Sequence, residues 1–317
     1  MIKIDPVVKA PYDPNFAPME LIARAYQKAV AYAESQMVAV AVVRNQGYTS
    51  TLRMKIFKDG TNDELNNAVM DRIVKTLLWA RGGYKIVICG SKPLYEYFRQ
   101  AYSVGGSRDF DRDFMSTVYE RPFEVEYVEK AEDAPKDKEA SSSVGRHLEG
   151  CRIGFDAGGS DRKVSAVIDG ETVYSEETIW FPKTATDPKY QYDGILESMK
   201  AAAAHMPRVD AIGVSSAGVY IDNKAMVCSI FNSLSKEDFK NYAKPIYLNV
   251  AKELGPDIPI EVANDGDVTA LAGAMDLDDT GVLGIAMGTS EAGGYVDVTG
   301  NITGWLNELA FAPVDFY

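Results

Sequence analysis

The sequence has few cysteines and no long uncharged apolar run. Its three cysteines, Cys89, Cys151 and Cys228, are widely spaced in apolar surroundings, so we expect neither a disulfide framework nor a Cys-x-x-Cys metal site. The N-terminus lacks a signal-peptide pattern, and no segment stays apolar for the ~20 residues that a membrane helix needs. We therefore expect a cytoplasmic protein with reduced, buried cysteines and no membrane partner.

Basic residues are also in the minority. The chain has 33 Lys and Arg against 46 Asp and Glu, which gives a formal net charge of -13. A nucleic-acid surface needs clustered Lys and Arg, and no such cluster occurs. The composition therefore predicts no nucleic-acid partner.

The chain of 317 residues is long enough for two or three domains, and its 46% hydrophobic and 25% charged residues are ordinary for a globular protein. Residues 131–150 read AEDAPKDKEASSSVGRHLEG, which is charged and has no apolar periodicity. Such a segment is typical of a linker between folded units. We therefore divide the chain there.

The first segment, residues 1–130, predicts an N-terminal domain of alternating strands and helices. Apolar residues recur every fourth residue from Leu65 to Leu77, which indicates an amphipathic helix. The other expected elements are helices at 19–36 and 94–102 and strands at 38–43, 51–57, 85–89 and 123–128. This order favours an α/β or α+β layered domain. The turn at 105–107 is expected to lead into a charged loop.

In the second half, polar turns follow apolar strands. A strand, a glycine turn and a second strand occupy residues 152–170, and further strands are expected at 211–215, 260–263 and 281–287. Helices are expected at 192–205, 238–254 and 268–275. In open α/β sheets, ligands collect at the carboxyl ends of the strands. The turns at 158–160, 216–218, 264–266 and 288–294 are therefore the candidate site.

These turns hold the groups that phosphoryl transfer needs, namely a phosphate cradle, a cation ligand and a base. Gly158, Gly159 and Ser160 offer N–H and hydroxyl donors to an anion. Asp156 is the candidate ligand of a hydrated cation, and Asp265 is the candidate base. Each signal taken singly also fits a helix cap or a plain turn.

The order of the motifs resembles a known family. Residues 156–163, DAGGSDRK, are similar to the D-x-G-G-[TS]-x-x-[KR] phosphate motif of the sugar-kinase, heat-shock-protein and actin superfamily. The Asn264-Asp265 pair before an alanine-rich helix, with Gly288-Thr289-Ser290 and Gly293-Gly294 after it, is similar to the ROK sugar kinases. The resemblance covers residues 151–317.

It implies an α/β protein built from actin-like ATPase (RNase H-like) lobes with an additional N-terminal α/β domain. Residues 151–276 would form the first lobe, and residues 277–317 the incomplete start of the second, nucleotide-binding lobe. Residues 1–130 have no assigned role. A degenerate RNase H-like lobe that completes the nucleotide site is one option for them.

The resemblance also implies roles for individual residues. Asp265 would be the base that deprotonates a sugar hydroxyl, and Asp156 would hold Mg²⁺ through a bound water. The residues expected to bind the phosphates of ATP are Gly158, Gly159, Ser160, Lys163, Gly288, Thr289 and Ser290. Those expected to bind the sugar are Ser216, Gly218, Asn232, Asn264 and Glu308. Phe311 stands where the family has a histidine, and no zinc-binding cysteine cluster follows, so no zinc is expected.

Three function classes remain open. The first is an ATP- and Mg²⁺-dependent kinase of a hexose or amino sugar. The second is a sugar-binding sensor that has lost catalysis on the same fold, and the third is an assembly module that needs no Asn264-Asp265 pair. The oligomeric state stays open, with a homodimer as one option.

Overall fold

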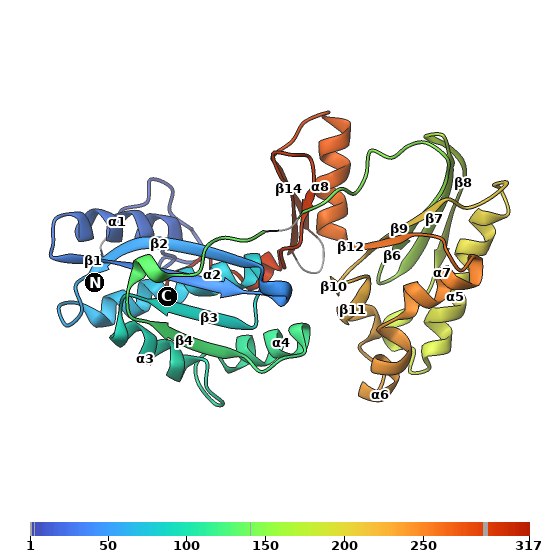
Figure 1. The fold of residues 1–317 in the computed structure, drawn as a ribbon. Helices are drawn as coiled ribbons and strands as arrows, with labels where there is room; N and C mark the ends of the chain where they lie inside the picture. The colour runs from blue at the N-terminus through green and yellow to red at the C-terminus, as the bar shows by residue number, and fades with distance from the viewer. Residues whose placement is uncertain (1, 3, 140, 288–290) are drawn as a thin grey trace. The chain divides into compact units, whose positions relative to one another are not determined.

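The computed structural model describes residues 2, 4–139, 141–287 and 291–317 (Figure 1). The chain forms two compact units. Unit 1 comprises Met1–Ala140 and Gly304–Tyr317, and unit 2 comprises Ser141–Thr303. The boundary at 140 and 141 lies inside the expected linker, whereas the expected lobe at 277–317 is divided between the two units.

Unit 1 contains one mixed sheet and four α-helices in its described part. The elements are α1 (Met19–Ala31), β1 (Ser35–Val43), β2 (Thr49–Phe57), α2 (Asp63–Arg81), β3 (Lys85–Cys89), α3 (Lys92–Ala101), α4 (Asp109–Tyr119) and β4 (Glu124–Val128). The strand order is β2-β1-β3-β4, in which β3 and β4 are parallel and the other pairs antiparallel. The mixture of helices and strands agrees with the predicted α/β class of this domain. The strand order of this sheet differs from that of the main sheet of unit 2, described below.

Two helices of unit 1 differ from the sequence-based expectation. The helix expected at 19–36 ends at Ala31, because Ser35 already begins β1. The charged loop expected after 105–107 is the helix α4, which buries Met115, Val118 and Tyr119 on one face. Charged residues between these apolar positions concealed the helical period.

The C-terminal segment Gly304–Tyr317 is part of the unit 1 fold. The ring of Phe311 stacks on Trp79 of α2 with their centroids 4.2 Å apart. The backbone N–H of Glu308 donates to the carbonyl of Trp79 at 3.2 Å, and Trp305 Nε1 donates to Glu139 at 3.0 Å. Aromatic stacking and these hydrogen bonds explain why the segment leaves unit 2.

Unit 2 is built on a five-stranded sheet. Its strands are β6 (Cys151–Ala157), β7 (Asp161–Ile168), β8 (Glu171–Ile179), β9 (Ala211–Ser216) and β12 (Ile260–Asn264). They lie in the order β12-β9-β6-β7-β8, with β6, β9 and β12 parallel and β7 antiparallel to both of its neighbours. Numbered by chain order this is 5-4-1-2-3, the arrangement of an RNase H-like lobe. The predicted fold class is thus confirmed for unit 2.

Helices cover one face of this sheet. The helices α5 (Pro188–Ala203) and α7 (Ile246–Leu254) pack on that face (Figure 1). Their core includes Phe155, Val214 and Val262 from three adjacent strands. The alternate residues, such as Gly154 and Gly213, lie on the other face of the sheet because side chains alternate along a strand.

Two further differences occur between β9 and β12. A short hairpin, β10 (Val219–Ile221) and β11 (Lys224–Val227), was not predicted. The helix expected at 238–254 is interrupted by Pro245: α6 (Lys236–Asp238) continues into a π-helical turn, and α7 starts only after the proline. A proline N has no hydrogen to donate, so it favours a helix start over a helix interior.

A second layer of unit 2 follows β12. The helix α8 (Asp265–Asp276) packs on the antiparallel pair β13 (Val282–Met287) and β14 (Glu291–Val296), as Figure 1 shows. The sheet continues through β15 (Ile302–Thr303) to β5 (Ser141–Ser142). Within the residues described, no helix has the length and apolar character to cross a membrane.

Candidate active site

The polar turns at the carboxyl ends of three parallel strands lie side by side. The register pairs Ala157 of β6 with Ser216 of β9, and Ser216 with Asn264 of β12. One residue earlier, Asp156 is paired with Ser215. The fold of unit 2 therefore brings together three of the predicted turns, at 156–160, 216–218 and 264–265.

Asn264 and Asp265 form the N-terminus of α8. The Asn264 side chain caps the helix by accepting a hydrogen bond from Gly266 N–H at 2.7 Å, while its Nδ2 donates to the Gly218 carbonyl at 2.7 Å. Gly266 N–H also donates to Asp265 Oδ1 at 3.0 Å. The cap of α8 thus links the β12 turn to the β9 turn and sets the direction of Asp265.

The Asp265 carboxyl is electrostatically distinct. Burial raises its pKa, the hydrogen bond from Gly266 N–H opposes that rise, and the nearby Asp156 carboxylate adds to it. A carboxylate with a raised pKa accepts a proton more readily than an ordinary one. This electrostatic environment is suited to a general base.

The same shift predicts a stability change for Asp265→Asn. The folded state binds the Asp265 proton more tightly than the unfolded state does, so stability from this group is present at low pH and lost as pH rises through the folded pKa. The neutral amide removes that loss. We expect the melting temperature to rise by about 2 °C at pH 7, with a smaller gain at pH 4, in calorimetric scans. A lower melting temperature of Asp265→Asn than of wild type at pH 7 would contradict a raised pKa of Asp265 in the folded state.

The turn between β6 and β7 is held by Trp180. Its indole Nε1 donates to the Gly158 carbonyl at 2.9 Å, and its backbone N–H donates to the Ser160 carbonyl at 3.1 Å. Two carbonyls of the turn therefore accept hydrogen bonds from the same residue. The Ser160 hydroxyl is 3.1 Å from Asp161.

Lys163, the expected phosphate ligand, lies among carboxylates. Its ammonium forms an ion pair with Asp161 and lies 3.9 Å from Glu177. The hydrogen bond to Asp161 raises the pKa of Lys163, and the charge of Asp156 adds to the rise. The positive charge of Lys163 is therefore largely balanced by carboxylates of β7 and β8.

Sequence reasoning missed Lys183, which lies against the same turn. A Cβ built on Gly159 would stand 2.7 Å from Cε and 2.8 Å from Nζ of Lys183. Lys183 follows β8, a strand that the sequence analysis did not predict. Asp161 pairs with Ile179, so the end of β8 lies beside the glycine turn. A prediction of β8 as the next antiparallel strand after β7 would have indicated Lys183.

The expected sugar ligands of unit 2 occupy different environments. The Ser216 side chain is fully buried, and its Oγ accepts hydrogen bonds from the hydroxyls of Tyr220 at 2.8 Å and Tyr247 at 3.0 Å. Gly218 takes a positive φ of 129° in the turn that meets Asn264. Asn232 is exposed at the end of a short helix. Asn264 is the register partner of Ser216 and donates its side-chain hydrogen bond to Gly218.

The remaining expected ligands do not belong to the described part of unit 2. Gly288, Thr289 and Ser290 lie outside the described residues. Glu308 belongs to unit 1, whereas Asp265 belongs to unit 2. The described site therefore consists of the β6, β9 and β12 turns of unit 2.

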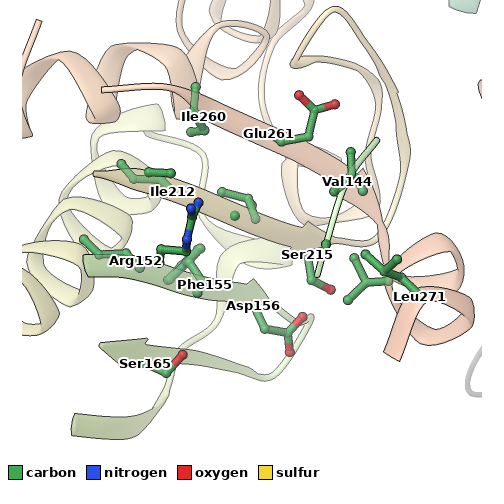
Figure 2. Close-up of a pocket in the computed structure, with 18 of the residues that line it drawn as sticks. Val144, Arg152, Phe155, Asp156, Ser165, Ile212, Ser215, Ile260, Glu261 and Leu271 are labelled. Carbon is green, nitrogen blue, oxygen red and sulfur yellow. The ribbon is translucent and has the colours of Figure 1, made fainter. Parts of the chain in front are cut away.

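A hollow of about 710 Å³ lies on the sheet face opposite α5 and α7. Figure 2 shows Asp156 and Ser215 at neighbouring strand ends beside it, with Arg152 and Glu261 further along the sheet. It reaches the candidate site at Asp156 and Lys163, but Asp265 and the glycine turn do not line it. The hollow and the turns at the strand ends therefore share Asp156.

The donor set suits Mg²⁺ better than a transition metal. Mg²⁺ is commonly held by one or two carboxylates together with substrate phosphates and water. Asp156 and Asp265 are close enough for the charge of Asp156 to raise the pKa of Asp265. The Asp156 carboxylate makes no hydrogen bond to another residue in the described part of the chain. No group of three or more His, Cys, Asp or Glu that could hold a metal occurs among the described residues.

This fold and arrangement define an α/β lobe with an acidic, glycine-containing site at its strand ends. No protein-family model matches the sequence, and no curated protein matches it. Similar solved structures include ROK-family sugar kinases, matching about half of the chain.

One is an inorganic polyphosphate/ATP-glucomannokinase from Arthrobacter sp. strain KM, at 22% identity and a TM-score of 0.41 over 51% of this chain and 63% of that one. A ROK hexokinase from Thermus thermophilus matches at 17% identity and a TM-score of 0.39, over 50% and 51% of the two chains. A glucokinase from Parabacteroides distasonis matches at 19% identity and a TM-score of 0.38, over 49% of this chain and 46% of that one. The chain thus spans between 46% and 63% of the length of these structures.

Proposed function

We propose that this protein transfers a phosphoryl group from ATP to a hydroxyl of a hexose or amino sugar. The observation that carries the proposal is the Asp265 carboxyl, whose pKa is raised in part by the nearby Asp156. Asp265 follows β12 and the glycine turn follows β6, with only β9 between these two strands. A base, a cation ligand and a phosphate cradle are the parts that phosphoryl transfer requires.

In this mechanism, Asp265 accepts the proton of the attacking sugar hydroxyl. Asp265 is the first residue of α8, and the Asn264 cap fixes the start of this helix directly after β12. Asn264 is proposed to contact neighbouring sugar hydroxyls. Its Nδ2 donates to Gly218 and its Oδ1 accepts from Gly266 N–H, so the second Nδ2 hydrogen and the second lone pair of Oδ1 are the groups left for that contact.

The turn at Gly158, Gly159 and Ser160 is proposed to hold the phosphates through its N–H groups, and Asp156 is proposed to hold Mg²⁺ through a bound water. When bound, the ion would balance the charge of the donor phosphates. Glu308, assigned to the sugar by resemblance, belongs to unit 1, so its part in sugar binding remains a separate proposal.

A sugar-binding protein without catalysis is the second candidate. It is favoured by the division of the expected second lobe, since residues 277–303 fold in unit 2 while Gly304–Tyr317 folds in unit 1.

The test is a coupled assay of ADP release over a panel of hexoses and amino sugars, combined with calorimetric binding of the same sugars. We expect at least one sugar to stimulate ADP release well above the rate with water alone. Sugar binding with no turnover would favour the sensor. Neither binding nor turnover for any sugar would reject both proposals.

A further inference from the structure

The glycine turn between β6 and β7 has a definite hydrogen-bonding polarity. Trp180 occupies the Gly158 and Ser160 carbonyls, at 2.9 Å and 3.1 Å. The N–H groups of Gly158, Gly159 and Ser160 donate no hydrogen bond to any residue that the structure describes. Successive N–H groups without partners form a concave site for an anion.

Lys183 supplies a positive charge at this turn. Its side chain runs over Gly159, where a Cβ would stand 2.8 Å from Nζ. Within the described chain, no carboxylate lies within ion-pair distance of that ammonium. The contrast is with Lys163, whose charge is shared with Asp161 and Glu177.

The backbone around Lys183 is fixed from two sides. The Lys183 carbonyl accepts a hydrogen bond from Ser233 Oγ at 2.5 Å, and the Pro182 carbonyl accepts one from Gln191 Nε2 at 3.0 Å. Gln191 is fully buried on α5. The segment that carries Lys183 is thus tied to the core of unit 2, and only the side chain is free to follow a ligand.

We infer that Lys183, and not Lys163, is the cation that holds the terminal phosphate of the phosphoryl donor on the Gly158–Ser160 turn. This inference rests on the proposed function for the identity of the anion. The shared chemistry is a chain of linked phosphates, which a nucleoside triphosphate and inorganic polyphosphate both provide. An ammonium without a carboxylate partner gains more from a phosphate than one that must leave its partner.

The test compares Lys183→Met with Lys163→Met, a matched loss of one lysine charge. Binding of tripolyphosphate and of ATP, each with Mg²⁺, is measured by titration calorimetry without sugar. We expect Lys183→Met to weaken binding of both about tenfold and Lys163→Met to change it less than about threefold. Lys183→Arg should recover most of the affinity.

Two results would overturn the inference. One is a Lys183→Met protein that binds like wild type, or loses no more than Lys163→Met does. The other is a wild-type protein that binds neither tripolyphosphate nor ATP. This experiment measures binding and not turnover. Its result therefore still tests the role of Lys183 if the protein proves unable to phosphorylate a sugar. Equal affinity for the two probes indicates recognition of the phosphate chain alone, and tighter binding of ATP indicates contacts to the nucleoside, both with Lys183 as the cation.

Gly159→Ala is a second, independent variant. The added methyl group would stand 2.7 Å from Cε of Lys183 and displace the ammonium without removing its charge. We expect an intermediate loss of affinity with an unchanged melting temperature, because the displaced atoms belong to the flexible end of an exposed side chain. Affinity equal to wild type would count against Lys183 lying over the turn in solution.

Discussion

Asp265→Asn is expected to lower kcat for sugar phosphorylation by about 10²–10⁴-fold, the range that a general base contributes. The amide keeps the shape of the side chain, and its Oδ1 can still accept the hydrogen bond from Gly266 N–H. What is lost is the ability to take the proton from the sugar hydroxyl. Since binding groups are retained, we expect sugar affinity to change little, so that the loss appears in kcat and not in KM.

The matched control is Asp257→Asn, which removes an exposed carboxylate from the turn before β12. This variant should keep wild-type kcat and melting temperature. The measurement is steady-state ADP release with the sugar selected from the panel, together with calorimetric sugar binding. Retention of more than about a tenth of the wild-type kcat in Asp265→Asn would show that another group, or water, accepts the proton.

Gly294→Ala is expected to destabilise unit 2 more than the other two glycine-to-alanine variants, Gly159→Ala and Gly273→Ala. Gly294 of β14 lies directly against the first turn of α8, and a Cβ there would overlap the Gly266 carbonyl oxygen and the Cα of Asp267. Both are backbone atoms, so α8 must move as a whole. We expect a loss of about 3 kcal/mol in the free energy of unfolding, which is a fall of roughly 6–12 °C in melting temperature.

Because Asp265 is the first residue of α8, this displacement should also reduce sugar phosphorylation. Gly273→Ala is the control on the same helix, since a Cβ at Gly273 would be 3.9 Å from its nearest neighbour, Val282. Alanine favours the helix by up to about 1 kcal/mol over glycine, so that variant should be as stable as wild type or more stable. The measurement is the unfolding of both variants by heat or denaturant. Equal stability of the two variants would show that α8 and β14 do not pack this closely.

The fold was predictable where apolar periodicity is uninterrupted. The strand at 85–89 was predicted with its observed limits, and the β6–β7 hairpin follows from the glycine turn between two apolar runs. By contrast, β8 was not predicted, because it is an edge strand with mostly exposed residues and little apolar alternation. Helix α4 was concealed in the same way by its charged residues.

For the candidate site, local motifs identified carboxylates and turns but could not identify their partners. Asp156 and Asp265 stand out in the sequence because each follows an apolar strand. Lys163 and Lys183 are equally plausible phosphate ligands by residue type. The ion pair with Asp161 and the unpredicted course of β8 distinguish them, and both depend on strand pairing.

The sequence by itself determined the α/β class of unit 2, and it indicated a linker at 131–150 and polar turns after the apolar strands. These properties depend on residue type and on spacing within a few neighbours. Only the tertiary structure decided that Gly304–Tyr317 folds in unit 1, that the Ser216 hydroxyl faces two tyrosines, and that Lys183 lies over Gly159. Each of these joins residues distant in the chain, and such contacts depend on packing across the whole unit, which local spacing does not encode.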